Sequence, residues 1–240
     1  MTRLERLHEG KAKIVYATDD PDVYIQDFKD SATAQDGLKK GTILDKGRMN
    51  NTISARLFTL LEEAGVRTHF LGTESDTAMR IRRLDMLKVE FVVRNVVAGS
   101  LANRIGYPEG TALKKPPLVE YYYKDDALHD PLLCLGHLEE LGVVTPEELA
   151  EATRMARKIN ETLQKFFLER GLILVDFKLE FGRDNAGNIV LGDEISPDTC
   201  RLWDAETREK LDKDRFRRDM GGVEEAYAEV LRRILPESNV

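Results

Sequence analysis

The sequence is poor in cysteine, in tryptophan and in long apolar runs. Its two cysteines, Cys134 and Cys200, are too few and too far apart for a disulfide framework or a metal quartet. The N-terminus has no apolar stretch of the kind found in signal peptides, and no apolar run approaches the roughly 20 residues that span a bilayer. We therefore expect a reducing, cytoplasmic location and no membrane insertion.

The charge balance argues against one class of partner. The chain of 240 residues carries 36 Lys and Arg against 43 Asp and Glu, a formal net charge of -7 at pH 7. This negative surplus disfavours general nucleic-acid binding, although it is compatible with a local basic pocket for a small anion. The 42% apolar and 33% charged content is typical of a soluble globular chain with one large or two small domains.

The first third of the sequence predicts a small sheet with one helix. Residues 51–64 repeat apolar side chains at helical spacing, and Gly65 follows in the position of a C-terminal cap. Residues 31–37 have the composition of a loop. Strands are predicted over residues 7–16 with a glycine turn inside, and over residues 23–29, 66–71, 78–84 and 89–97. The last strand is nearly continuous in apolar residues and is expected at the centre of a sheet.

The second part of the chain predicts helices around an acidic hairpin. Thr145, Pro146 and Glu148 combine an N-cap, a proline at the first helical position and a capping-box Glu, so a helix should start there. Residues 223–234 predict a last amphipathic helix. We expect an N-terminal lobe of residues 1–86 and a C-terminal lobe of residues 87–240, with a cleft where the lobes face each other.

The acidic hairpin, residues 175–195, holds the strongest chemical signal. Side chains alternate along a strand, so one face of its first segment carries Asp176, Lys178 and Glu180. Pairing with the second segment would add Asp193 or Glu194 to this face, where like charges repel unless a cation lies between them. Oxygen ligands without His or Cys favour Mg²⁺ or Mn²⁺ over zinc. The alternative is a solvated hairpin edge with ordinary acidic residues.

The segment after the hairpin favours a binding site. Residues 196–204 are predicted as a loop, yet they include Arg201 and the only tryptophan, Trp203. Arginine is suited to bidentate capture of carboxylate or phosphate, and loops at strand ends often carry binding groups. The alternative is a surface turn in which Trp203 fills the core and Arg201 pairs with Asp204.

Two further segments are candidates for binding anions. Residues 10–13 lack the Walker pattern, but Lys11 and Lys13 would share a strand face beside a flexible turn, which suits covering a polyphosphate. Ordinary surface lysines are the alternative. Arg94 interrupts an apolar strand and must be paired or face a pocket, and we favour the pocket. Ser100 would stand at the start of a helix, where an anion or a plain N-cap fits.

Together these segments closely resemble the SAICAR synthetase family, phosphoribosylaminoimidazole-succinocarboxamide synthase of de novo purine biosynthesis. The resemblance runs from the N-terminus to the last helix and rests on residues 10–13, 90–101, 124–131, 175–182 and 192–204. The Val-Asp-Phe-Lys-Leu-Glu-Phe-Gly and Gly-Asp-Glu-Ile-Ser-Pro-Asp segments are its most specific parts. Chance agreement of both, in this order and spacing, is implausible.

The resemblance implies a fold and a reaction. The fold would be α+β in two lobes, related to ATP-grasp, with a small mainly antiparallel β lobe with one helix, a larger α/β lobe and a nucleotide cleft between them. The reaction would join the carboxylate of CAIR to the amine of L-aspartate, with ATP hydrolysed to ADP and phosphate. A carboxylate is a poor electrophile, so an acyl phosphate is expected first, and positioning by Lys and Mg²⁺ would carry the chemistry.

Roles for individual residues also follow from the resemblance. The nucleotide would contact Lys11, Ala12, Lys13, Met86 and Lys124. Mg²⁺ would be held by Glu180 and Asp193, with Asp176 facing both CAIR and its metal. The phosphate of CAIR would be received by Arg94, Ser100 and Arg201, with Lys178 facing CAIR. Asp36 would lie near the reacting groups, and Ser196 and Asp198 would help to shape the L-aspartate pocket. The expected catalytic residues are Lys13, Asp36, Asp176 and Lys178.

Two positions depart from the family pattern. Lys88 stands where many members have proline, which could loosen the hinge, and Cys200 occupies a variable position beside Arg201. Neither residue touches the expected chemistry. The family also leads us to expect a homodimer.

Two other functions stay open at this point. A small-molecule kinase with a similar cleft would release ADP without L-aspartate, and a non-catalytic anion-binding module would release none. Glu180 and Asp193 are expected on a solvated strand face, so Glu180→Gln or Asp193→Asn should abolish turnover with little loss of fold. Arg201→Ala should weaken the binding of CAIR far more than that of ATP.

Overall fold

The computed structural model describes residues 1–34 and 37–235. The strands are β1 (Arg3–Glu9), β2 (Lys13–Thr18), β3 (Val23–Phe28), β4 (Ser31–Ala34), β5 (Lys39–Thr42), β6 (Phe70–Thr73), β7 (Ala78–Arg82), β8 (Asp85–Arg94), β9 (Leu118–Tyr123), β10 (Leu132–Leu133), β11 (Leu172–Arg183), β12 (Ile189–Leu191) and β13 (Cys200–Asp204). The helices are α1 (Lys46–Glu63), α2 (Ser100–Ile105), α3 (Leu135–Leu141), α4 (Pro146–Leu168), α5 (Asp214–Arg217) and α6 (Val223–Ile234), and η2 (Asp126–Leu128) is a 3-10 turn.

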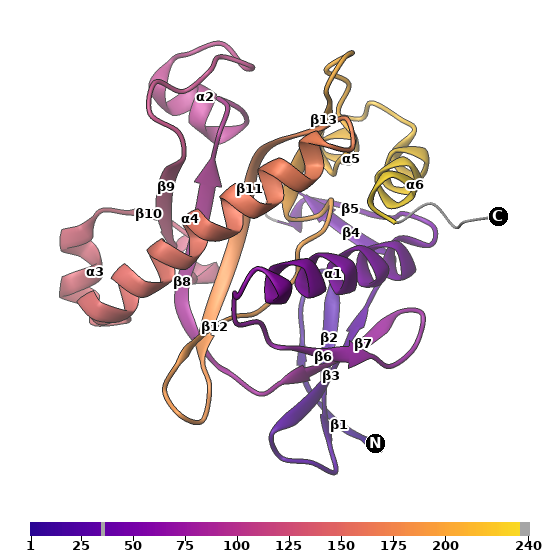
Figure 1. Ribbon diagram of the computed structural model, residues 1–240, viewed down its shortest axis with the longest axis vertical. Coiled ribbons are helices and arrows are strands. Elements are labelled where there is room, and N and C mark those ends of the chain that lie inside the picture. Colours follow the sequence, from indigo (N-terminus) through magenta and orange to yellow (C-terminus); the bar gives the residue numbers. More distant parts are fainter. Residues whose placement is uncertain (35–36, 236–240) are drawn as a thin grey trace.

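Two antiparallel sheets form the framework (Figure 1). The first has the order β1-β2-β3-β7-β6, and the second has the order β10-β9-β8-β11-β12, with β13 also paired to β11. Figure 1 shows α4 lying across β11, and α1 packs on strands of the first sheet. The α+β class expected from the sequence is therefore confirmed.

The register between β8 and β11 places charged side chains opposite one another. Asp176 pairs with Arg94, Lys178 with Val92 and Glu180 with Glu90. The alternate residues of β11, among them Phe177 and Phe181, are buried in the hydrophobic core. The expected division of this strand into a core face and a charged face is confirmed, and β8 lies at the centre of its sheet as predicted.

The predicted helix starts differ in accuracy. At α4 the capping box forms as expected, because Thr145 and Glu148 exchange hydrogen bonds between side chain and backbone. At α1 the helix begins at Lys46, five residues before the predicted start at residue 51. Asp30 explains the earlier start, since its carboxylate accepts the backbone N–H of Gly47 at 2.8 Å and so satisfies a donor of the first turn.

Several strand predictions were wrong. Residues 31–37 were predicted as a loop, but residues 31–34 form β4, which pairs with β5. Residues 196–204 were also predicted as a loop, which is correct for residues 196–199, whereas residues 200–204 form β13, which pairs with β11. Both errors concern short strands whose partners the local pattern does not reveal. The strand predicted over 66–71 starts only at Phe70, and the strand predicted over 89–97 runs from Asp85 to Arg94 instead.

A continuous hydrophobic core connects the two sheets. Phe58 and Ile81 from the first part of the chain belong to the same buried cluster as Phe91, Leu163 and Phe181 from the second. The chain passes from the first sheet to the second between β7 and β8. The division into lobes of residues 1–86 and 87–240 stays a prediction. Among the helices of the described residues, none combines enough length with enough apolar character to span a membrane.

Candidate active site

A cavity of about 210 Å³ opens on the charged face shared by β8 and β11. The structure brings six of the predicted site residues into its lining: Arg94, Ser100, Asp176, Lys178, Asp198 and Arg201. Glu90, Tyr122 and Arg217 line the same cavity and were not predicted. We call this cavity the substrate pocket.

Two arginines of the substrate pocket meet on one carboxylate. Asp176 Oδ2 accepts hydrogen bonds from Arg94 Nη1 at 2.8 Å and from Arg201 Nη1 at 2.9 Å. Arg94 Nε also donates to Glu120 at 2.6 Å. Burial lowers the pKa of both arginines, but the facing carboxylates outweigh it and raise the pKa above the ordinary value. Arg94 is therefore both paired and in a pocket, and the pocket wall carries two fixed positive charges.

The turn between β8 and α2 is fitted closely to this wall. Arg94 Nη2 donates to Ser100 Oγ at 3.3 Å, at the start of α2. Gly99 adopts a φ of 53°, and a Cβ at this position would lie 2.5 Å from Arg201 Nη2. Glycine is therefore required here both by the backbone conformation and by the approach of the guanidinium.

A second charged group adjoins the pocket, and we call it the lysine–carboxylate cluster. Its members are Lys13, Lys124, Lys178, Glu90, Glu180, Asp193 and Glu194. Lys178 Nζ lies 3.0 Å from Glu90, 3.2 Å from Glu180 and 3.9 Å from Asp193. Because Lys178 and Glu90 also line the substrate pocket, the two charged groups are continuous.

Residues far apart in the sequence close this cluster. Lys13 of β2 contacts Asp193 and lies 3.0 Å from Glu194, and Lys124 after β9 contacts Glu180. Asp193 follows the short β12 with a φ of 60°, which ends the strand and lets the side chain meet Lys13 and Lys178. The first sheet thus contributes the cation Lys13 to a cluster whose Lys178, Glu90 and Glu180 belong to the second sheet.

The electrostatics keep the lysines charged. Burial lowers the pKa of Lys13 and Lys178, but Asp193 and the neighbouring glutamates outweigh it and hold both pKa values well above that of a free lysine. Burial likewise raises the pKa of Asp193, but Lys13 and Lys178 outweigh it and the pKa falls well below its usual range. At neutral pH both lysines are fixed cations, and neither is a general base.

The floor of the pocket contains a buried polar network around Asp198. Lys46 Nζ donates to Asp198 Oδ2 at 3.0 Å, and the hydroxyl of Tyr227 donates to Oδ1 at 2.5 Å. Ser196 does not line the pocket, and its hydroxyl donates to Glu194 at 2.5 Å. Asp198 therefore faces the cavity, while Ser196 orients a member of the lysine–carboxylate cluster.

Of the residues predicted for the nucleotide, Lys13 and Lys124 belong to the lysine–carboxylate cluster, and Lys11, Ala12 and Met86 do not. Lys11 is exposed in the turn between β1 and β2, 3.7 Å from Asp126. Ala12 shares this turn, and Met86 is 39% exposed near the start of β8. Asp36 lies outside the described residues.

Some expectations about these residues need correction. Glu180 is only 7% exposed, so it does not lie on the solvated strand face that was expected for it. Asp193 is also held inside the cluster, with 14% of its side chain exposed. The alternative in which Arg201 pairs with Asp204 is wrong, because Arg201 pairs with Asp176 and Asp214. Trp203 is buried, as that alternative proposed.

Sequence reasoning missed Glu90, Tyr122 and Arg217 of the pocket lining, and Lys46 behind Asp198. Glu90 lies four residues before Arg94 on the same strand, so the alternation that identified the face of β11 could have identified it. Lys46 is wholly buried at the start of a helix, and Arg217 lies on the four-residue α5. No local pattern points to Lys46 or Arg217.

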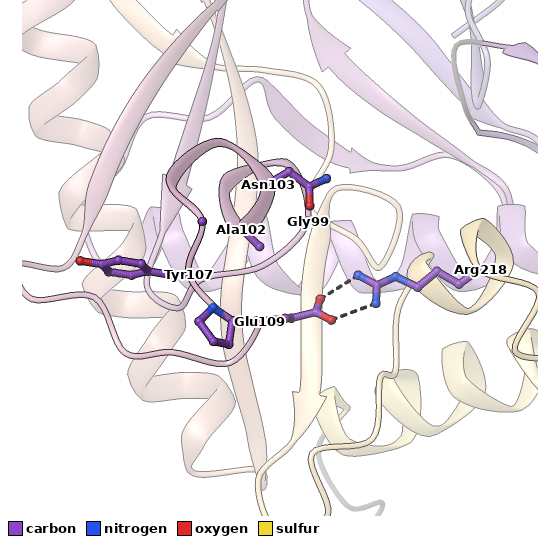
Figure 2. Close-up of a pocket in the computed structure, with 8 residues that line it drawn as sticks. Gly99, Ala102, Asn103, Tyr107, Glu109 and Arg218 are labelled. Atoms are coloured by element: carbon purple, nitrogen blue, oxygen red, sulfur yellow. Dashed lines mark hydrogen bonds and ion pairs between the residues drawn. The ribbon is translucent and has the colours of Figure 1, made fainter.

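A larger surface hollow of about 660 Å³ lies beside α2 (Figure 2). Figure 2 shows Arg218 reaching Glu109 across it, with hydrogen bonds of 2.9 and 2.7 Å. None of the residues predicted for the site is among its described lining residues. The chemistry of the chain is therefore concentrated in the smaller substrate pocket.

Comparisons with known proteins agree with this geometry. The sequence model of the family described as SAICAR synthetase matches residues 6–234. Phosphoribosylaminoimidazole-succinocarboxamide synthase of Chlorobium chlorochromatii is 60% identical over 98% of this chain and 99% of its own length.

Solved structures give the same result. That of phosphoribosylaminoimidazole-succinocarboxamide synthase from Ehrlichia chaffeensis superposes with a TM-score of 0.94 at 41% identity, covering 97% of this chain and all of that one. A SAICAR synthetase in complex with ADP superposes with a TM-score of 0.93 at 50% identity, covering 98% of this chain and 100% of that chain. The chain therefore belongs to the SAICAR synthetase family, the ATP-dependent ligases that join CAIR and L-aspartate in purine biosynthesis.

Proposed function

We propose that this chain carries out its family's reaction on CAIR and L-aspartate with Mg²⁺-ATP, using the substrate pocket and the lysine–carboxylate cluster as one active site. The observation that carries this proposal is the continuity of the two groups through Lys178 and Glu90. An anionic substrate held in the pocket would place a reacting group beside the cations that face a nucleotide phosphate.

The reaction is proposed to pass through an acyl phosphate. A carboxylate oxygen of CAIR attacks the γ-phosphorus of ATP, and ADP leaves. The amine of L-aspartate then attacks the activated carbonyl carbon and loses a proton, and phosphate leaves with the carboxylate oxygen. Positioning and charge neutralisation supply most of the rate enhancement in such phosphoryl transfer, so fixed lysines suit the task.

Nucleotide binding is assigned to residues around the β1–β2 turn and the start of β8. The ADP complex of a relative 50% identical to this chain supports use of the nucleotide. Lys11, Ala12, Lys13 and Lys124 would face the phosphates, and Met86 would touch adenine. Lys13 is well suited to this role because its charge is permanent at neutral pH.

The donor set fits a hard divalent cation. The lysine–carboxylate cluster has four carboxylates against three ammonium groups, and Glu180 and Asp193 both approach Lys178. Oxygen donors with surplus negative charge suit Mg²⁺, which would neutralise the transferring phosphate. We propose that Glu180 and Asp193 hold this ion, although within residues 1–34 and 37–235 no three metal-ligating side chains form a ready-made site. Asp176, whose oxygens accept from two arginines, is assigned to those arginines.

Substrate binding is assigned to the remaining pocket residues. Arg94, Ser100 and Arg201 would receive the phosphate of CAIR, since arginine forms charge-assisted hydrogen bonds with phosphate oxygens. Lys178 would stand between CAIR and the nucleotide. Asp198, with Ser196 behind Glu194, would help to shape the L-aspartate pocket, and Asp36 is proposed near the reacting groups.

The setting is proposed from the resemblance. The enzyme would act in the cytoplasm as a homodimer on small-molecule substrates, without nucleic acid or membrane as a partner. Cys134 and Cys200, the two cysteines of the sequence, are both free, which is compatible with a reducing compartment.

Release of ADP by the purified protein tests the function. The protein is incubated with Mg²⁺-ATP, CAIR and L-aspartate, and each component is omitted in turn. We expect the succinocarboxamide product and stoichiometric ADP only with the complete mixture. Rapid ADP release without L-aspartate, with a stable phosphorylated product, would identify a kinase. Absence of ADP release in the complete mixture would contradict any catalytic role.

A further inference from the structure

Two arginines of the substrate pocket are joined behind its wall by one buried carboxylate. Asp214 Oδ2 accepts from Arg201 Nε at 2.9 Å, and Asp214 Oδ1 accepts from Arg217 Nη1 at 2.6 Å. Arg201 belongs to β13 and Arg217 to α5, and both line the pocket. Asp214 itself is 1% exposed and is not among the described lining residues.

The charge on Asp214 is set by these arginines. Burial raises the pKa of this carboxyl, but Arg201 and Arg217 outweigh it and lower the pKa to about 2. Arg218 Nη2 adds a third cation, 3.5 Å from Oδ2. Asp214 is therefore ionised at neutral pH and holds guanidinium groups that would otherwise repel each other.

A second carboxylate fixes the main chain around this group. Asp212 Oδ1 accepts the backbone N–H of Asp214 at 2.7 Å, and Asp212 Oδ2 accepts the backbone N–H of Leu202 at 2.9 Å. Leu202 directly follows Arg201 on β13. Asp212 therefore ties the start of α5 to the strand that carries the first arginine.

Arg201 is held on two sides. Its Nε is used by Asp214, and its Nη1 donates to Asp176 at 2.9 Å. With two edges fixed, the plane of the guanidinium is set before any anion arrives. Arg217 has 35% of its side chain exposed, and its contact with Asp214 links it to Arg201 through one carboxylate.

We propose that Asp214 is a positioning residue that sets the spacing of Arg201 and Arg217 for the phosphate-bearing substrate. This inference rests on the proposed function and deepens it. Two cations held in one geometry need no ordering when the anion binds, so less binding energy is lost. Asp214 acts only through the arginines, and its effect should appear in the binding of CAIR and not in that of ATP.

The variant Asp214→Asn tests the proposal with little change in volume. Asparagine keeps one acceptor oxygen, and its amide group would place donors against the second guanidinium. We expect the KM for CAIR to rise about tenfold or more, because one charge-assisted contact is lost. The KM for ATP should stay within about twofold, as expected for a change confined to one subsite.

The variant Asp214→Glu provides the conservative comparison. It keeps the charge but lengthens the side chain, so the KM for CAIR should rise less than in Asp214→Asn. If Asp214→Asn does not fold, the KM of Asp214→Glu for CAIR is measured in its place, and it should still exceed that of the parent. A matched control is Asp204→Asn, which removes a carboxylate 2.8 Å from Arg233 at the other end of β13, away from the pocket. The control should leave the KM for CAIR unchanged.

Arg201→Ala, measured beside these variants, separates the two levels of the proposal. If Arg201→Ala raises the KM for CAIR and folded Asp214→Asn does not, the positioning role is wrong while the site assignment stands. If Arg201→Ala leaves the KM for CAIR unchanged, the assignment of the phosphate site is itself wrong. An equal rise in the KM for ATP and for CAIR in Asp214→Asn would show a general structural role and overturn the inference.

Discussion

Among single residues, Lys178 joins the substrate pocket to the lysine–carboxylate cluster. Its ammonium group faces three carboxylates of the lysine–carboxylate cluster, and its side chain lines the substrate pocket. Glu180 faces both Lys178 and Lys124. A carboxylate shared in this way has a structural role as well as its proposed role in holding Mg²⁺.

The variant Glu180→Gln should therefore lose stability as well as activity. A neutral amide leaves Lys178 and Lys124 with less compensating charge, so we expect turnover to fall by at least about a hundredfold and the free energy of unfolding to fall by about 1–3 kcal/mol. Urea unfolding and ADP release measure the two effects. Glu169→Gln, which alters an exposed glutamate 3.8 Å from Arg170, is the control and should change neither. Full turnover in Glu180→Gln would exclude Glu180 from the metal site.

Asp212 predicts a dependence of stability on pH. Burial first, and then the charge of Asp214, raise the pKa of this carboxyl to about 7, against the lowering influence of Arg201 and Arg217. Since the folded state binds the proton more tightly than the unfolded state, this contribution to stability is present below the ordinary pKa and is lost as the pH rises through 7.

The variant Asp212→Asn has no such titration. Between pH 5 and pH 8 the free energy of unfolding of the parent should fall by about 2 kcal/mol relative to that of the variant. Urea unfolding at each pH measures the gap. A constant gap would mean that Asp212 is ionised throughout, as the two backbone donors at its oxygens would favour.

At the scale of helices and strands, an element was predicted correctly where the residues that stabilise it lie within it or next to it in the sequence. The start of α4 was predicted correctly because its capping box, Thr145 and Glu148, is a local sequence motif. β13 and β4 were not predicted, because each is stabilised by pairing with another strand. β13 pairs with β11 and β4 pairs with β5, and the residues of β13 and β4 do not indicate these partners. The early start of α1 depends on Asp30, which lies outside the helix. Local propensity cannot report partners of this kind.

The approach of β8 to β11 gives a prediction at this scale. A Cβ at Gly182 would lie 2.8 Å from Leu84 Cβ, 2.9 Å from the carbonyl oxygen of Asp85 and 3.1 Å from Met86 Sδ. Gly182→Ala should therefore cost about 1–3 kcal/mol of stability through overpacking. Because Met86 is proposed to touch adenine, the KM for ATP should rise more than the KM for CAIR.

The control for this variant is Gly136→Ala on α3, where the nearest atom is Cys134 Sγ at 3.9 Å. This change should not lower the melting temperature, because alanine has the higher helix propensity. An unchanged melting temperature in Gly182→Ala would show that the strands have room to separate at this point.

At the scale of the whole molecule, the site depends on contacts between distant parts of the chain. Lys13 and Asp193 are separated by 180 residues and meet only when the two sheets are packed together. The sequence patterns identified two arginines of the pocket, Arg94 and Arg201, and the acidic strand, and the family resemblance supplied proposed roles for the rest. Asp214 and Arg217 could not be predicted, since α5 is too short to show a period and its importance comes from contact with β13.

The fate of the carboxylate oxygens of CAIR tests the central claim most directly. CAIR labelled with ¹⁸O in its carboxylate is turned over with Mg²⁺-ATP and L-aspartate, and the released phosphate is examined by mass spectrometry. An acyl phosphate predicts one ¹⁸O in each phosphate and one in the new amide. Unlabelled phosphate released while the succinocarboxamide product forms would contradict the account.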